Sequence, residues 1–296
     1  MRKAFIQLHI AVFIAGFTAI LGRLITLNEG LLVWYRLLFT IITMWPLFAL
    51  QKKLQRISFK EMMKIGGVGI IASLHWATFY ASIKYSNVSV ALVCFSSIGF
   101  FTAIFEPIIT RGRFNYIEGL LGLIAVAGIS LIFHFDPSFK VGIILGIITA
   151  MLGSLFPILN RGLLKTHSTE TVTVYELTGG FVFLSIVMPF YLNIFPTEHL
   201  IPTWSDFIWL LILAWICTVY AFQLSMEALK KISAFTVNLT YNLEPIYGIS
   251  LAFVLFREDK MLTNAFYAGL ALIVCSVLLQ SLLVYRANRR VAAQKK

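Results

Sequence analysis

The sequence predicts an all-α polytopic membrane protein with ten transmembrane helices arranged as two inverted five-helix repeats. Three observations lead to this prediction: an apolar composition, the number of apolar segments, and a weak similarity between the two halves. Of the 296 residues, 59% are apolar, and the mean hydropathy is +0.87, which is typical of membrane proteins. Since a spanning helix needs about 20 apolar residues, ten spans use nearly the whole chain and leave no room for an extramembrane domain.

The ten apolar segments are separated by short connections rich in Gly, Pro, Asn and charged residues. The first segment is too long for a cleaved signal peptide and is interpreted as the first span. The predicted spans, in chain order, are Ala4–Leu27, Gly30–Leu50, Met62–Lys84, Val88–Thr110, Asn115–Phe133, Val141–Asn160, Thr171–Ile194, Trp204–Ala228, Ile232–Phe256 and Leu262–Tyr285.

Basic residues are distributed unequally between the two sides of this topology. One side receives 18 of the 24 Lys and Arg residues, the other receives only Lys84, Lys140, Arg257 and Lys260, and Arg23 and Arg36 lie inside spans. The positive-inside rule places both termini in the cytoplasm, which requires an even number of spans. We therefore expect a multi-pass membrane protein with cytoplasmic termini. The net charge of +11 belongs to these connections and does not indicate nucleic-acid binding.

The two halves resemble each other weakly but in a common order. The segment 79–93, FYASIKYSNVSVALV, lies over 225–239, SMEALKKISAFTVNL, which pairs Lys84 with Lys230 and, further on, Arg111 with Arg257. VWYRL (33–37) lies over TVYEL (173–177). Because five spans is an odd number, the second unit must be inverted relative to the first, a common arrangement in secondary transporters. The expected domains are residues 1–135, residues 140–286 and a basic cytoplasmic tail, residues 287–296.

The whole chain resembles the EamA-type members of the drug/metabolite transporter superfamily. The residues that carry the resemblance are WYRLL around Arg36, FYASIKYSNVSVALV, NLEPIYGISLAFVLFRED, and three glycines of the fifth span (Gly119, Gly122 and Gly128). The resemblance implies a ten-helix fold with two EamA repeats and solute transport, often efflux, across a plasma membrane or a bacterial inner membrane. The chain departs from the family pattern in the fourth span, where Gly99 stands at the position expected to hold a proline.

The segment Asn238–Asp259 is apolar enough to cross a bilayer yet carries polar groups near its middle. A carboxylate at that depth costs roughly 3 kcal/mol, so Glu244 should face a protein interior or a wet cavity. Pro245 removes a backbone donor, which predicts a helix kink. The segment indicates either a polar helix contact or a cavity wall with candidate binding residues Asn238, Tyr241, Asn242 and Glu244.

Further candidate binding residues lie at a similar depth in the first repeat. The third span carries His75, Trp76 and Phe79, where His75 either holds two helices together or faces a solute. Arg36 and Glu176 correspond in the two repeats, but they lie roughly 12 Å apart along the membrane normal. Arg36 is nearer in depth to Glu244, so a pair between these two is expected.

These side chains suit a small amphipathic organic solute, because both charge signs, amides and aromatic rings are present. The predicted function is a secondary transporter, an exporter, of metabolites such as amino acids, working by alternating access. A multidrug exporter and a non-transport membrane protein (lipid-handling or receptor-like) remain alternatives. No enzyme motif, metal site or cofactor site is recognised. Expected partners are the solute and membrane lipids, with protons as a candidate coupling ion and either a monomer or a homodimer as the assembly.

Overall fold

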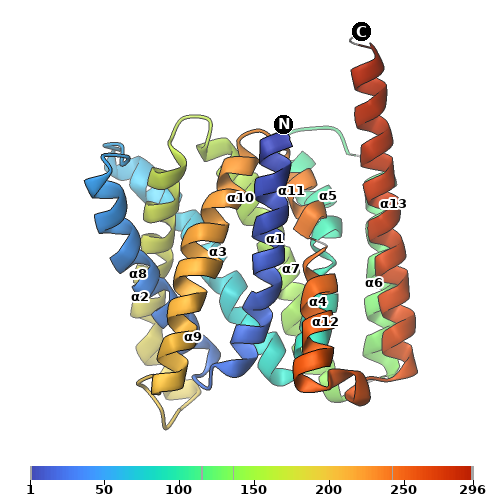
Figure 1. The fold of residues 1–296 in the computed structure, drawn as a ribbon, viewed down its shortest axis with the longest axis horizontal. Coiled ribbons are helices and arrows are strands. Elements are labelled where there is room, and N and C mark those ends of the chain that lie inside the picture. Colours follow the sequence, from blue (N-terminus) through green and yellow to red (C-terminus); the bar gives the residue numbers. More distant parts are fainter. Residues whose placement is uncertain (1, 115, 136, 242, 295–296) are drawn as a thin grey trace.

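The computed structural model is helical throughout its elements and describes residues 2–114, 116–135, 137–241 and 243–294, with no strand among them. Short turns and 3₁₀ segments join the helices into one upright bundle (Figure 1). The elements are α1 (Arg2–Leu24), α2 (Glu29–Leu50), α3 (Phe59–Tyr85), α4 (Val88–Phe95), α5 (Ile98–Thr110), α6 (Tyr116–Phe135), η1 (Pro137–Phe139), α7 (Lys140–Leu163), α8 (Thr169–Ile194), α9 (Trp204–Ala214), η2 (Trp215–Tyr220), α10 (Ala221–Leu229), α11 (Ala234–Tyr241), α12 (Glu244–Phe256), η3 (Glu258–Met261) and α13 (Asn264–Gln294).

Six segments of the described chain are long and apolar enough to cross a membrane. They are Lys3–Leu24, Glu29–Leu50, Val88–Thr110, Lys140–Leu163, Thr169–Ile194 and Trp204–Leu229. Three shorter apolar helices, Gly119–Leu131, Glu244–Phe256 and Asn264–Ser276, fall short of that length. The chain is therefore a multi-pass membrane protein, while the full set of ten crossings stays a prediction.

The predicted fourth span is divided into α4 and α5 in the structure. The division falls at Ser96 and Ser97, whose hydroxyls donate to the carbonyls of Leu92 and Cys94 at 3.1 and 2.7 Å. The same carbonyls also accept the backbone N–H groups of Ser96 and Ser97 at 3.1 Å, so the end of α4 keeps its carbonyls bonded within the protein. The predicted span Val88–Thr110 is found with the same bounds, but the break within it was not expected, because it needs no proline and leaves no strong sequence signal.

The predicted ninth span is likewise two helices, α11 and α12. α11 ends at Tyr241 and α12 begins at Glu244, with Pro245 in its first turn, where a missing backbone N–H is tolerated. The offset of 146 residues that pairs Lys84 with Lys230 also brings Ser97 onto Leu243. The two breaks therefore occupy corresponding positions of the two repeats.

A second local feature repeats at the same offset. Arg111 follows α5 with φ of 55°, and Arg257 follows α12 with φ of 57°, so both helices end in a left-handed residue. Figure 1 shows that α4–α5 and α11–α12 run in opposite directions through the bundle. The two segments share few identical residues, but their helices begin and end at corresponding positions.

The two ends of the bundle can be told apart by the chain termini. Both termini lie at the upper end in Figure 1, called here the terminal end; the other is the opposite end. α3 starts at the terminal end with a capping box, in which Ser58 and Glu61 bond each other's backbone N–H at 3.1 and 3.3 Å. It then crosses the bundle between α7 and α8.

The contact between α3 and α8 depends on glycine. A Cβ added at Gly69 would lie 1.7 Å from the carbonyl oxygen of Glu176, and one at Gly179 would lie 2.3 Å from the Cα of Gly66. No side chain fits at such distances, so the small residues allow two backbones to meet, as is common between membrane helices. This close approach fixes α3, which carries much of the site described next.

Candidate functional site

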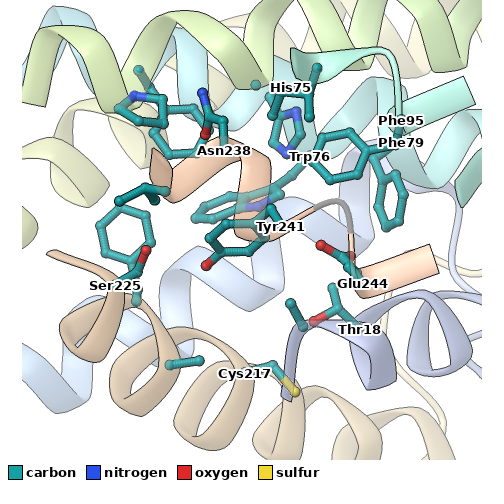
Figure 2. A pocket seen from close by; sticks show the side chains of 18 of the residues that line it. Thr18, His75, Trp76, Phe79, Phe95, Cys217, Ser225, Asn238, Tyr241 and Glu244 are labelled. Atoms are coloured by element: carbon teal, nitrogen blue, oxygen red, sulfur yellow. The ribbon is translucent and has the colours of Figure 1, made fainter. Parts of the chain in front are cut away.

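A cavity lies in the middle of the bundle, where the broken helices meet the continuous ones (Figure 2). Its open space is about 90 Å³, several times the ~10–15 Å³ that one water molecule requires. Residues from both repeats line it: Ala15, Thr18, Arg36, His75, Trp76, Phe79, Phe95, Ile98, Gly153, Phe156, Pro157, Asn160, Cys217, Ala221, Phe222, Ser225, Met226, Leu229, Val237, Asn238, Tyr241 and Glu244.

Arg36 is the only Lys or Arg among these lining residues and is 2% exposed. Its Nε donates to the hydroxyl of Thr218 at 2.8 Å, and its Nη1 donates to the hydroxyl of Tyr80 at 2.9 Å. The guanidinium carbon stands 4.0 Å from the centroid of the Trp76 ring, a cation–π contact. Neutral groups on α3 and η2 therefore hold this cation in place.

The expected ion pair between Arg36 and Glu244 is absent. Both residues line the cavity, but no nitrogen of Arg36 lies within 4.0 Å of the Glu244 carboxylate. The reason is local: the π-helical segment η2 places the Thr218 hydroxyl beside Arg36, and that hydroxyl itself donates to the Leu213 carbonyl at 2.9 Å. Such wide turns occur often at functional sites.

Glu244, Asn238 and Tyr241 face the cavity from the α11–α12 break. The Asn238 amide donates to Thr102 at 2.8 Å, so its carbonyl oxygen stays available to the cavity. Figure 2 shows the Tyr241 hydroxyl directed toward Ser225, and the Glu244 carboxylate near Thr18. Glu244 is 5% exposed, and its carboxylate forms no hydrogen bond or ion pair with another residue in the described part of the chain. The fourth candidate in this segment, Asn242, lies outside the described residues.

His75, Trp76 and Phe79 form the wall contributed by α3. His75 Nδ1 lies 2.9 Å from the Thr149 carbonyl of α7. A carbonyl can only accept, so Nδ1 is assigned as the donor in this contact, which leaves Nε2 for a second partner. The His75 ring stacks on Phe79 at 6.4 Å and packs against Phe95 at 5.5 Å. His75 thus both joins two helices and lines the cavity, the two roles that the sequence left open.

Sequence reasoning predicted Asn238, Tyr241 and Glu244 but missed other lining residues of the second repeat, such as Phe222 and Ser225, although the repeat alignment contained them. At the offset of 146 residues, Trp76 corresponds to Phe222 and Phe79 to Ser225. The same offset relates His75 to Ala221, Phe95 to Tyr241 and Ile98 to Glu244, and all ten residues line the cavity. Part of the cavity lining is therefore built from corresponding positions of the two halves, and in most of these pairs a polar residue in one half corresponds to an apolar residue in the other.

The sequence model of the EamA-like transporter family matches the chain twice, over residues 2–134 and 140–282. The chain belongs to the EamA-like transporter family. Members of this family are membrane transporters of the drug/metabolite superfamily, not enzymes. A comparison with curated proteins finds no match. One solved structure, described as "Crystal structure of protein", has 15% identity and a TM-score of 0.69, covering 95% of this chain and 98% of that chain. At this identity the likeness shows the fold alone.

Within this EamA-like protein, Glu176 lies close to the cavity without lining it. Its side chain is fully buried, and neither carboxylate oxygen has a hydrogen-bond partner among the described residues. Asn160 faces it from α7, and its amide atoms are also unpartnered. Asn160 in turn lines the cavity. The cavity thus has one carboxylate, Glu244, in its wall, and a second, Glu176, lies behind the wall residue Asn160.

Metal coordination has no support in the described part of the chain, which contains no cluster of three or more His, Cys, Asp or Glu side chains suited to a metal ion. The polar groups that reach the cavity are one guanidinium, one carboxylate, an imidazole, two amides and hydroxyls. Aromatic rings separate them. Such a lining can bind an organic molecule by a few directed contacts and a large apolar area.

Proposed function

We propose that the protein is a secondary transporter that exports small amphipathic organic metabolites, such as amino acids, by alternating access. The observation that carries the proposal is the cavity between the repeats, where Arg36 and Glu244 face the same space without neutralising each other. A zwitterion fits this arrangement, since its carboxylate can meet Arg36 while its ammonium group meets Glu244. The rings of Trp76, Phe79 and Phe222 supply apolar contact for the side chain of the solute.

Other solute classes fit the cavity less well. A multivalent anion such as a sugar phosphate would need more than one cation in the wall, whereas Arg36 is the only Lys or Arg there. A lipophilic drug cation is the second candidate, because Glu244 is unpaired and several aromatic rings surround the space. Arg36 opposes it by repelling a second cation. A non-transport role, lipid-handling or receptor-like, finds no support in the family.

The proposed mechanism requires that the cavity open to one side at a time. Its lining reaches toward the terminal end, as far as Leu229 and Val237. At the opposite end, contacts between the repeats support closure. Asp206 accepts hydrogen bonds from the Thr26 backbone and hydroxyl at 2.7 and 2.8 Å, and Glu258 accepts from the N–H groups of Val88 and Ser89 at 3.1 and 2.8 Å.

The wider architecture follows from the same proposal. Two inverted repeats of five helices, residues 1–135 and 140–286, would exchange conformations between an inward-facing and an outward-facing state. The basic tail, residues 287–296, and the terminal end would lie in the cytoplasm, with the protein in a plasma or bacterial inner membrane as a monomer or homodimer. The structure then corresponds to a state closed toward the outside.

The function is tested by solute flux in proteoliposomes, with Arg36→Ala as the informative variant. We expect flux of zwitterionic amino acids, and a loss on the order of 10-fold or more in Arg36→Ala, since a charge-assisted hydrogen bond contributes about 1.5–3 kcal/mol. Flux of the corresponding amino-acid amides, which lack the carboxylate, should fall much less. Arg36→Lys keeps the charge and serves as the matched control. Phosphate-bearing solutes as the best substrates would contradict the charge argument, and no flux above protein-free vesicles would contradict transport.

Proton coupling is tested at Glu244, the carboxylate in the cavity wall. Glu244→Gln keeps the size and polarity of the side chain but cannot release a proton, so we expect flux that no longer responds to a pH gradient. The control is Glu198→Gln, in the exposed connection between α8 and α9. The readout is flux at several imposed pH gradients with equal protein in the vesicles. If flux in Glu244→Gln still responds to the pH gradient, Glu244 does not couple protons and its role is limited to binding the solute.

Membrane orientation is tested by labelling single cysteines introduced at positions 84, 140, 165 and 231. In intact cells we expect an impermeant thiol reagent to reach positions 84 and 140, and to reach 165 and 231 only after the membrane is opened. Position 140 is exposed while position 84 is partly buried, so labelling should be slower at position 84. Labelling of position 165 from outside would falsify the proposed topology.

A further inference from the structure

A second hollow, separate from the cavity, lies on the outside of the bundle. We call it the α3–α5–α7 groove: its residues come from α3, α5 and α7 and from the turn that follows α7. Its open space is about 470 Å³, and it shares no lining residue with the cavity. The transport proposal assigns it no role.

Glycines keep this groove open. A Cβ added at Gly67 on α3 or at Gly162 on α7 would meet no atom within 4 Å. At most other described glycines, an added Cβ would come too close to a neighbouring segment, as it would at Gly69. The space in front of Gly67 and Gly162 is therefore not used for helix packing and is available to another molecule.

The groove has a cationic end and an apolar wall. Lys64, Arg161 and Lys165 lie at its terminal end, where α3 begins and α7 finishes. One carboxylate, Glu106, lies among them, 3.7 Å from Arg161, so positive charge remains in excess. From Lys64 the α3 wall continues to Ile71, about 10 Å along the helix axis at ~1.5 Å per residue.

The side chains that line this deeper part are aliphatic. Val68 and Ile71 come from α3, Ile109 from α5, and Ile158 and Leu159 from α7. In a multi-pass membrane protein such a surface faces the acyl chains of the bilayer, while the ends of the helices lie among the headgroups. The groove therefore offers cations at headgroup depth directly above an apolar channel.

We propose that the α3–α5–α7 groove binds an anionic phospholipid. Its phosphate lies among Lys64, Arg161 and Lys165, and one acyl chain follows the aliphatic wall. Basic pockets between membrane helices recognise anionic headgroups by charge, and the excess of cations favours these lipids over zwitterionic ones. A soluble phosphate compound would use the cations but not the wall, which makes a lipid the occupant that fits the whole groove.

A bound lipid would contact the helices that build the transport cavity. α3 carries His75 and Trp76 on its cavity side, and α7 carries Asn160. A lipid seated between α3, α5 and α7 would hold these helices at the spacing seen here. The lipid would thus stabilise the state that the structure shows.

The proposal is tested on the purified full-length protein in nanodiscs. Dioleoylphosphatidylglycerol, dioleoylphosphatidylcholine and soluble glycerol 3-phosphate are compared as ligands, with binding measured by lipid titration and by thermal unfolding. We expect phosphatidylglycerol to bind at least 10-fold more tightly than phosphatidylcholine. Lys64→Gln/Lys165→Gln should lower that affinity on the order of 10- to 30-fold, since each basic residue near an anionic headgroup contributes about fivefold.

Two further variants separate a built site from general attraction. Lys52→Gln/Lys231→Gln removes two exposed cations from the same end but outside the groove and should leave phosphatidylglycerol binding unchanged. Gly162→Leu extends a side chain into the groove from a position where an added Cβ meets no atom within 4 Å, so we expect it to fold and still weaken lipid binding, with Gly162→Ala intermediate. Equal binding of the two lipids, equal losses in both lysine double variants, or protection by glycerol 3-phosphate as strong as by phosphatidylglycerol would overturn the proposal.

Discussion

The architecture depends on keeping the backbone satisfied where two helices are broken inside the bundle. In hydrocarbon, an unpaired N–H or C=O group costs several kcal/mol, so a break is tolerated only where protein groups or a wet cavity take over. In the first repeat, the hydroxyls of Ser96 and Ser97 bond carbonyls at the end of α4. In the second, Pro245 stands in the first turn of α12, where its missing N–H is harmless. The cavity lies beside both breaks.

Charge placement follows from this arrangement. Arg36 is buried but held by Thr218, Tyr80 and Trp76, so its position does not depend on a carboxylate. Glu244 has no partner among the described residues and shares the same space. A buried pair that neutralised itself would gain little from a solute, because the solute would have to break the pair first. Two separated charges can each bind part of a zwitterion.

The sequence predicted the framework better than the details of the site. The repeat alignment, weak in identity, is matched in the structure by the left-handed Arg111 and Arg257 and by the corresponding breaks. Arg36, His75, Trp76, Phe79, Asn238, Tyr241 and Glu244 line one cavity, while their part in binding stays a prediction. The partner of Arg36 could not be predicted, because the π-helical turn at η2 places Thr218 and no motif announces such a turn. The break at Ser96 was missed because serine carries no signal comparable to that of proline.

The central claim is that solute passes through the cavity between the repeats. The most direct measurement compares amino-acid flux in proteoliposomes for Ala221→Trp, which places a large ring in the cavity, and Ala271→Trp, which places the same ring on the exposed face of α13. The account predicts that flux falls at least 10-fold in Ala221→Trp and stays near wild type in Ala271→Trp, with both proteins folded. Equal flux in the two variants would show that the solute takes another path.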